Sequence, residues 1–154
     1  VSSMENATIS ILPRLKRLLL IDTKKERQSF HDYVDQFKIK CQEDQLVGNL
    51  SGGNQQKILV ARALMTNCKV LILLEPTRGI DVGAKSQMHQ IIHNFAEKGL
   101  AVIVVSSDLP EVINLSDRVM VMCNGKSMGF LEGDEINEDS IMLKAAGFKD
   151  GSVQ

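Results

Sequence analysis

The sequence predicts an α/β fold in which a helical portion is followed by a parallel βαβ unit and an antiparallel hairpin. Residues 69–74 and 101–105 are short, continuous β-prone apolar runs, a pattern typical of strands that are covered on both faces. Residues 84–96, between these runs, carry apolar side chains at helical spacing. Asn124 and Gly125 separate two further β-prone runs and form a strong signal for a two-residue hairpin turn.

The composition limits the class of protein. The chain has 154 residues, of which 44% are hydrophobic and 24% are charged, and its formal net charge is −1. This length corresponds to roughly one domain, and the apolar share is ample for a packed core. The near-neutral charge argues against a protein that binds nucleic acid through a basic face. The longest apolar runs, such as residues 70–74, are far shorter than the about 20 residues of a membrane-spanning helix.

Cysteine spacing and the first residues bear on the compartment. Cys41, Cys68 and Cys123 are widely spaced and include no C-x-x-C pair, which fits neither a disulfide framework nor a zinc site. We therefore expect a reducing, cytoplasmic setting. No basic start leads into an apolar segment at the N-terminus, so no secretory signal is expected. The first residue is Val1 rather than Met, which is consistent with a piece of a longer protein.

Residues 1–66 are predicted to be mainly helical. Pro13 lies early in the apolar stretch 9–21 and predicts a helix start or a kink there. Residues 23–37 are polar and rich in charge, and their apolar residues recur at the spacing of an amphipathic helix. These apolar residues are Phe30, Val34 and Phe37.

A loop over residues 46–53 is predicted to end in two glycines, and a helix is predicted from Asn54 to about residue 67. Apolar residues occupy two sides of that helix, so we expect it to be mostly buried. One side consists of Ile58, Ala61, Leu64 and Met65, and the other of Leu59, Val60 and Ala63.

The second half is predicted to alternate strand and helix. The helix over residues 84–96 ends at Gly99 and joins two strands, which makes a βαβ unit with parallel strands and an expected right-handed crossover. Residues 119–123 and 126–131 are the predicted strands of the hairpin. Residues 137–146 are predicted to form a last helix, and the candidates for its N-cap are Asn137 and Asp139.

The octapeptide LSGGNQQK (residues 50–57) has the features of an anion-binding turn. Glycine lets the backbone approach an anion closely, and the unpaired N–H groups of a helix's first turn favour negative charge. Ser51 adds a hydroxyl donor. The alternative is a plain serine N-cap that follows a flexible glycine loop, which a bare S-G-G would favour.

Polar side chains follow the two predicted parallel strands, at the edge of the sheet where ligands gather. Glu75 follows the first strand, where a carboxylate can orient water against a phosphate; the alternative is an ordinary surface glutamate. Residues 106–108 follow the second strand and could bring a hydroxyl to the same edge. Taken alone, that stretch is better explained as a cap for a helix near residues 110–115.

His89 and His93 have the i, i+4 spacing of some zinc sites. No third ligand is evident near them in the sequence. We therefore interpret both as exposed polar residues and predict no metal site.

Three motifs in order give the chain a resemblance to the ATP-binding subunit of an ABC transporter, over residues of about 5 to 146. They are LSGGNQQK (50–57), VLILLEPTRGIDVGAK (70–85) and VIVVSSDLPEVINLSDRVMVM (102–122). More narrowly, the chain resembles the second nucleotide-binding domain of the tandem ATPases that energise bacterial ribose, galactose and related monosaccharide importers. The details that indicate this subfamily are NQQK (54–57), RGID (78–81) and Ser107, where most ABC ATPases have a switch histidine.

The resemblance implies an incomplete P-loop NTPase fold, in which residues 1–66 form the helical subdomain and residues 67–154 the C-terminal part of a RecA-like core. It also implies a role for each matching residue. The residues implied to contact, in trans, the ATP of an opposing head-to-tail domain are Ser51, Gly52, Gly53, Asn54 and Gln56. The implied catalytic set is Glu75 as the catalytic base, Asp81 in the D-loop that couples the two sites, and Ser107 at the switch position.

Two departures from the family's pattern affect the chain's own nucleotide site. No G-x-x-x-x-G-K-[ST] phosphate loop occurs in the 154 residues. Leu74 stands where the family has an aspartate that helps to hold Mg²⁺, and leucine offers no oxygen ligand. The implied cofactors, ATP and Mg²⁺, are therefore expected to bind weakly or to be supplied by a partner domain. We expect no ATP turnover by this chain alone.

The resemblance implies an ATP-hydrolysing component of a bacterial sugar importer that is cytoplasmic and peripheral to the inner face of the cell membrane. Its implied partners are another nucleotide-binding domain and transmembrane permease subunits, with no nucleic acid. The alternative is a catalytically inactive partner or remnant that only lends its signature loop to another subunit's ATP site.

A chromosome-maintenance or DNA-repair ATPase is disfavoured, because residues 1–49 show no sustained heptads. A strand that the family has would border the predicted sheet but is missing from this chain. We therefore expect an unpaired sheet edge and exposed apolar surface, together with marginal stability or self-association.

Overall fold

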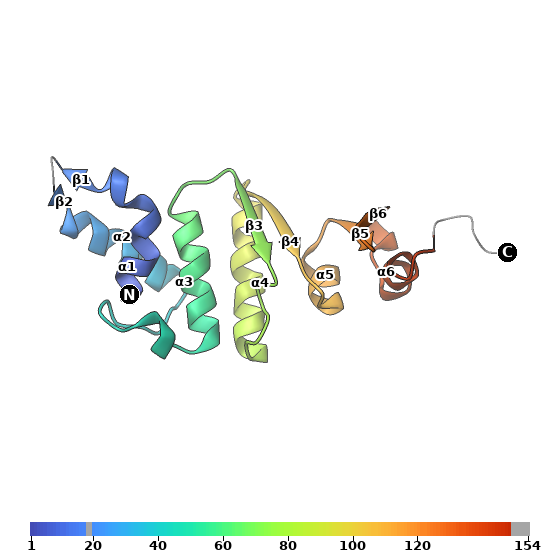
Figure 1. Cartoon of the computed structure of the whole chain (residues 1–154), viewed down its shortest axis with the longest axis horizontal. Coiled ribbons are helices and arrows are strands. Elements are labelled where there is room, and N and C mark those ends of the chain that lie inside the picture. Colours follow the sequence, from blue (N-terminus) through green and yellow to red (C-terminus); the bar gives the residue numbers. More distant parts are fainter. Residues whose placement is uncertain (18–19, 149–154) are drawn as a thin grey trace. The chain divides into compact units, whose positions relative to one another are not determined.

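The computed structural model describes residues 1–17 and 20–148, and its contacts divide the chain into two units (Figure 1). Unit 1 is Val1–Val105 and unit 2 is Ser106–Gln154. The division at residue 66 that the resemblance implies stays a prediction. None of the helices in the described part of the chain combines the length and the apolar character needed to cross a membrane.

Unit 1 begins with short helices and a small hairpin. Its first elements are α1 (Ser3–Thr8), the 3₁₀ helix η1 (Ile9–Arg14), β1 (Lys16–Arg17), β2 (Leu20–Ile21), α2 (Thr23–Gln36), the 3₁₀ helix η2 (Val47–Asn49) and α3 (Gly52–Leu64). The prediction for Pro13 was wrong, because this proline lies inside η1 and neither starts nor kinks an α-helix. The antiparallel pairing of β1 with β2 was not predicted.

Helix α1 packs against α2 and α3, and apolar side chains from all three fill the core of this part (Figure 1). Phe30 and Phe37 are buried, which confirms the predicted amphipathic helix. The expectation that α3 is mostly buried is confirmed, although Leu59 is 41% exposed while Ile58 beside it is fully buried. One flank of α3 therefore remains at the surface.

The predicted βαβ unit is confirmed. It consists of β3 (Val70–Leu74), α4 (Val82–Glu97) and β4 (Ala101–Val105), and the two strands are parallel. Their register pairs Val70 with Ala101 and continues to Leu74 with Val105. Helix α4 packs along this two-stranded sheet (Figure 1).

The expectation that β3 and β4 are covered on both faces was wrong. Leu71 is 4% exposed, whereas Ile72, the next residue, is 66% exposed. Alternate side chains of a strand lie on opposite faces, so one face of the sheet is packed and the other is open. The large apolar side chains of the open face are Val70, Ile72, Leu74, Ile103 and Val105. This open apolar face, which we call the open sheet face, confirms the predicted exposed apolar surface.

Unit 2 is built around an antiparallel hairpin. Its elements are α5 (Leu109–Leu115), β5 (Arg118–Cys123), β6 (Lys126–Glu132), the 3₁₀ helix η3 (Gly133–Glu135) and α6 (Glu138–Ala145). Asn124 and Gly125 have φ angles of 47° and 74°, the positive values that a two-residue type I′ turn requires, so the predicted hairpin is confirmed. The last helix is also confirmed, with Asn137 as its cap.

The asymmetry of the sheet predicts different costs for two adjacent substitutions. Leu71→Ala removes a buried side chain and should lower the free energy of unfolding by about 2–4 kcal/mol. Ile72→Ala removes a side chain that is already in water and should change it by less than about 0.5 kcal/mol. Urea unfolding of the two variants measures the difference, and equal shifts would contradict the packing described for β3.

Candidate functional site

The two glycines of the LSGGNQQK motif lie inside the first turn of α3. The helix begins at Gly52, two residues before the predicted start at Asn54. Ser51 occupies the N-cap position with an extended backbone, but its side chain makes no capping hydrogen bond. The N-cap side chains of the other α-helices in the described residues do accept a bond from the N–H three residues later: Ser2, Asp22, Asp81, Asp108 and Asn137. The plain serine cap is therefore not what the structure shows, and Ser51 leaves the N–H groups of the first turn available.

Close packing holds the start of α3 against the segment that leads into α4. A Cβ atom on Gly53 would lie 2.5 Å from the Cβ atom of Ala84, and one on Gly52 would lie 3.4 Å from the carbonyl oxygen of Gly79. One turn further along α3, the Nζ atom of Lys57 donates to the Oε1 atom of Gln87 at 2.6 Å. We call this set of contacts the α3–α4 seam.

Lys57 is a buried cation in this seam, with 3% of its surface exposed. Burial lowers the pKa of its ammonium group, and the nearby charges of Lys40 and Lys38 lower it further. The hydrogen-bond partner is a neutral amide, which satisfies one donor without forming an ion pair. The ammonium group of Lys57 thus joins the two helices although its burial is energetically unfavourable.

Asp81 is the N-cap of α4, and its carboxylate accepts the N–H of Ala84 at 2.8 Å. Because Gly52 approaches Gly79 and Ile80, the turn that contains Ser51 lies beside the turn that contains Asp81. These two predicted site segments, far apart in the sequence, are brought together in unit 1.

Glu75 follows β3 and has a φ angle of 48°, a conformation that non-glycine residues seldom adopt. Its N–H donates to the carbonyl oxygen of Val105 at 2.8 Å, which continues the pairing of β3 with β4 beyond the last strand residue. Strain of this kind often accompanies functional positions. Leu74, immediately before it, is 73% exposed.

Ser107 is exposed and belongs to unit 2. The neighbouring Asp108 caps α5 by accepting the N–H of Glu111 at 3.0 Å, and its own N–H donates to the Oγ atom of Ser106 at 3.0 Å. The cap interpretation of this stretch is therefore confirmed for Asp108. The role of Ser107 stays a prediction.

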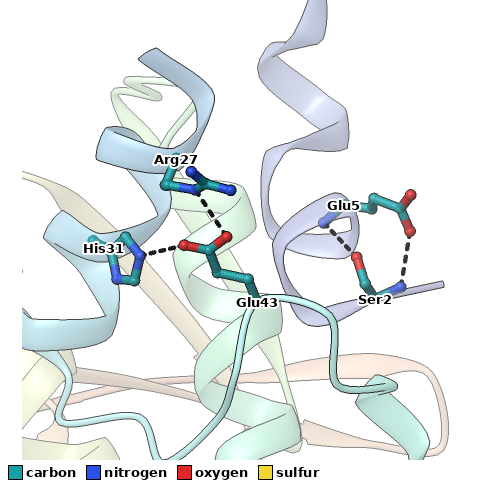
Figure 2. A network of polar contacts seen from close by, with 5 residues as sticks. All are labelled: Ser2, Glu5, Arg27, His31 and Glu43. Atoms are coloured by element: carbon teal, nitrogen blue, oxygen red, sulfur yellow. Dashed lines mark hydrogen bonds and ion pairs between the residues drawn. The ribbon is translucent and has the colours of Figure 1, made fainter. Parts of the chain in front are cut away.

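A polar cluster fixes the loop that precedes the Ser51 turn. The Oε2 atom of Glu43 accepts from the Nε atom of Arg27 at 2.8 Å, and its Oε1 atom lies 2.7 Å from the Nε2 atom of His31 (Figure 2). Arg27 and His31 both come from α2, so Glu43 fastens its loop to that helix. The hydrogen bond from His31 lowers the pKa of Glu43, the contacts with Arg27 lower it too, and desolvation opposes the change. We call these three residues the Glu43 clamp.

The profile of the ABC transporter family matches residues 2–78, which is half of the chain. The chain belongs to the ABC transporter family. It is 44% identical over 146 residues to a xylose import ATP-binding protein (XylG) of Moorella thermoacetica and 43% identical over 145 residues to a ribose import ATP-binding protein (RbsA) of Caldanaerobacter subterraneus. These matches cover 94% and 93% of this chain but only 29% of the length of each relative.

Solved structures of ABC transporter cassettes share the fold. A nucleotide-free ATP-binding cassette has a TM-score of 0.75 at 23% identity, with 88% of this chain and 57% of the cassette covered. A dimeric bacterial ABC transporter cassette has a TM-score of 0.70 at 20% identity, with 86% and 56% covered. The predicted incomplete ABC ATPase fold is thus confirmed.

Several residues that shape this ABC site were not singled out from the sequence. Gln87 and Lys40 lie outside the quoted motifs, and Ala84 lies inside one without having been assigned a role; their contacts with α3 come from segments that are distant in the sequence. Gln56, one of the residues implied to contact ATP, is partly buried on α3. The glycine at position 53 could have indicated a close approach of two helices, because a missing side chain is what such an approach requires.

The described residues include no ready-made set of side chains for a metal ion. No group of three His, Cys, Asp or Glu side chains within the described ranges is arranged to hold a metal ion, and Leu74 contributes no oxygen. His93 instead lies 3.3 Å from Glu97, one turn along α4.

The α3–α4 seam predicts that two adjacent glycines respond differently to alanine. Gly53→Ala should destabilise the chain by about 1–3 kcal/mol, because its new methyl group meets the fixed Cβ of Ala84. Gly52→Ala makes only ordinary contact and should be neutral or slightly stabilising, as alanine favours helix. Chemical unfolding measures both changes. Adding Ala84→Gly to Gly53→Ala should restore part of the stability, and no recovery would contradict a steric origin.

The Glu43 clamp predicts a pH dependence of stability. The pKa of Glu43 in the folded chain lies below the ordinary value of 4.5. The clamp therefore contributes fully to the free energy of unfolding above about that pH, and this contribution is lost as pH falls through the pKa of the folded state. Glu43→Gln should therefore flatten the loss of stability between neutral pH and the acid range. Urea midpoints at a series of pH values test this. Asp44→Asn, an equal change of charge outside the clamp, is the control and should leave the acid limb as steep as in the unaltered chain.

Proposed function

We propose that this chain is part of an ATP-hydrolysing subunit that energises sugar uptake through a bacterial ABC importer. In this proposal, the turn of residues 51–54 contacts the γ-phosphate of ATP held by a second nucleotide-binding domain. The observation that carries the proposal is the exposed Ser51, whose hydroxyl leaves the first-turn N–H groups of α3 uncapped. The names of the relatives, which are xylose and ribose import ATP-binding proteins, support sugar as the cargo.

The chemistry proposed for this turn is electrostatic. The N–H groups that begin α3 and the hydroxyl of Ser51 would stabilise negative charge on the phosphate as it is transferred. Gly52 and Gly53 have no side chain in the way, so the backbone can approach the phosphate closely. The family resemblance also implies contacts of Asn54 and Gln56 with the same ATP.

The remaining roles are proposals that rest on family membership and position. Glu75 would act as the catalytic base, Asp81 would couple the two sites, and Ser107 would contact the γ-phosphate. Residues 1–66 would form the helical subdomain, and residues 67–154 the C-terminal part of the core. Leu74 offers no oxygen to a magnesium ion, and we derive no step through one.

The proposed setting is the cytoplasmic face of the cell membrane. There the subunit would pair head-to-tail with another nucleotide-binding domain and dock on transmembrane permease subunits. The relatives named as sugar import proteins support this setting, and the dimeric cassette with the same fold supports the pairing.

A second candidate is a catalytically inactive partner or remnant that only lends its signature turn to another subunit's ATP. Leu74, which has no oxygen to offer a metal ion, favours it. The two candidates differ in whether the longest polypeptide that the gene encodes hydrolyses ATP in a Glu75-dependent manner. Hydrolysis that Glu75→Gln abolishes would favour the first candidate.

The trans role predicts activity only in a mixture. The purified 154-residue chain should hydrolyse no ATP, whereas adding it to an intact nucleotide-binding domain of a sugar importer should raise the ATPase rate of that domain. Ser51→Ala should reduce the stimulation at least about tenfold, because one hydrogen-bond donor to the transferred phosphate is lost. Release of inorganic phosphate measures each rate.

The matched control is Ser86→Ala, which removes the hydroxyl of an exposed serine on α4. It should stimulate as well as the unaltered chain. Absence of stimulation by the unaltered chain, or turnover by that chain alone, would overturn the trans role.

A further inference from the structure

The side chain of Asn54 joins the Ser51 hydroxyl to a distant backbone amide. Its Nδ2 atom donates to the Oγ atom of Ser51 at 2.9 Å, and its Oδ1 atom accepts the N–H of Lys40 at 3.1 Å. A backbone N–H can only donate, so it requires the amide oxygen of Asn54 to face Lys40. The NH₂ group must then face Ser51, which leaves a single orientation for the asparagine side chain.

This orientation determines what the serine hydroxyl can do. Because Asn54 donates to it, Ser51 is the acceptor in that bond and its own hydrogen remains for another acceptor. The same bond holds the serine side chain where it makes no cap for α3. Ser51 is also exposed, so this hydrogen can be donated to the oxygen of a ligand that approaches from solvent.

The segment that supplies the Lys40 amide is itself fixed in place. Three residues after Lys40, the Glu43 clamp fastens the segment to α2 (Figure 2). The carbonyl oxygen of Glu43 also accepts the N–H of Met4 at 3.1 Å, and the carbonyl oxygen of Gln45 accepts the N–H of Ser3 at 2.8 Å. Two helices, α1 and α2, therefore hold the loop to which Asn54 is bonded.

We propose that Asn54 is a positioning residue that orients the Ser51 hydroxyl toward the γ-phosphate of the partner domain's ATP, and that it acts through Ser51 instead of contacting the nucleotide. Lys40, held by the Glu43 clamp, sets the orientation of Asn54. This inference rests on the proposed function, and it replaces the direct nucleotide contact implied for Asn54 with an indirect role.

A double-mutant cycle in the mixed ATPase assay tests the inference. Asn54→Ala should lower the maximal stimulation about tenfold, while the concentration of the chain that gives half-maximal stimulation stays unchanged. In a chain that already carries Ser51→Ala, the same substitution should have no further effect. Asn94→Ala, at an exposed asparagine on α4, is the matched control and should leave stimulation intact.

Asn54→Asp separates the two hydrogen bonds of Asn54, one with the Lys40 amide and one with the Ser51 hydroxyl. An aspartate keeps an oxygen for the Lys40 N–H but cannot donate to Ser51. It should therefore stimulate as poorly as Asn54→Ala, while hydrogen exchange of the Lys40 amide stays as slow as in the unaltered chain. In Asn54→Ala that amide should exchange faster. A merely structural asparagine would instead show activity that follows the protection of Lys40.

The outcomes distinguish this inference from the proposed function. Absence of stimulation by the unaltered chain would contradict the trans role itself. Suppose that the unaltered chain stimulates normally, but that Asn54→Ala lowers the stimulation by the same factor with and without the Ser51 hydroxyl. That result would contradict only the positioning role. Full stimulation by Asn54→Asp would contradict it as well.

Discussion

The close approach of α3 to α4 at Gly53 is the constraint on which the candidate site depends. Two helices can come this near only where one of them lacks a side chain, and the buried Lys57 then joins them through a hydrogen bond to Gln87. The contact bears on the candidate site because it occurs at the N-terminal ends of both helices. The turn that presents Ser51 and the turn that ends in Asp81 therefore share one rigid support within unit 1.

Local chemistry allowed much of the fold to be predicted. The hairpin at Asn124 and the cap at Asn137 depend on a few adjacent residues, and both were predicted correctly. The burial of β3 was predicted wrongly. A continuous apolar run indicates that both faces of a strand can be packed, but it does not show whether the described residues cover both faces. The start of α3 at Gly52 was also missed, since glycine is a poor helix former and its place in a first turn depends on tertiary contacts.

The candidate site divides in the same way. The order of motifs supplied the candidate site residues, and the structure brings the Ser51 turn beside the Asp81 turn. The bond between Asn54 and Lys40 joins residues 14 positions apart across a segment that contains the short 3₁₀ helix η2, and no periodicity indicates such a contact. Sequence reasoning thus supplied candidate donors for a phosphate, but it gave no sign of the hydrogen bonds that join Asn54 to Ser51 and to Lys40.

The proposed contact with another domain's ATP requires fewer parts of the fold than a nucleotide site within this chain would. The support of the Ser51 turn, from the Glu43 clamp through Lys40 to the α3–α4 seam, consists of residues of unit 1 alone. The open sheet face has the opposite character, because its apolar side chains have no cover among the described residues of that unit. The chain also spans only 57% of a solved cassette of the same fold. Residues of unit 1 therefore suffice to hold the turn that contains Ser51, which supports the proposed role in trans. The open sheet face, in contrast, leaves apolar side chains uncovered.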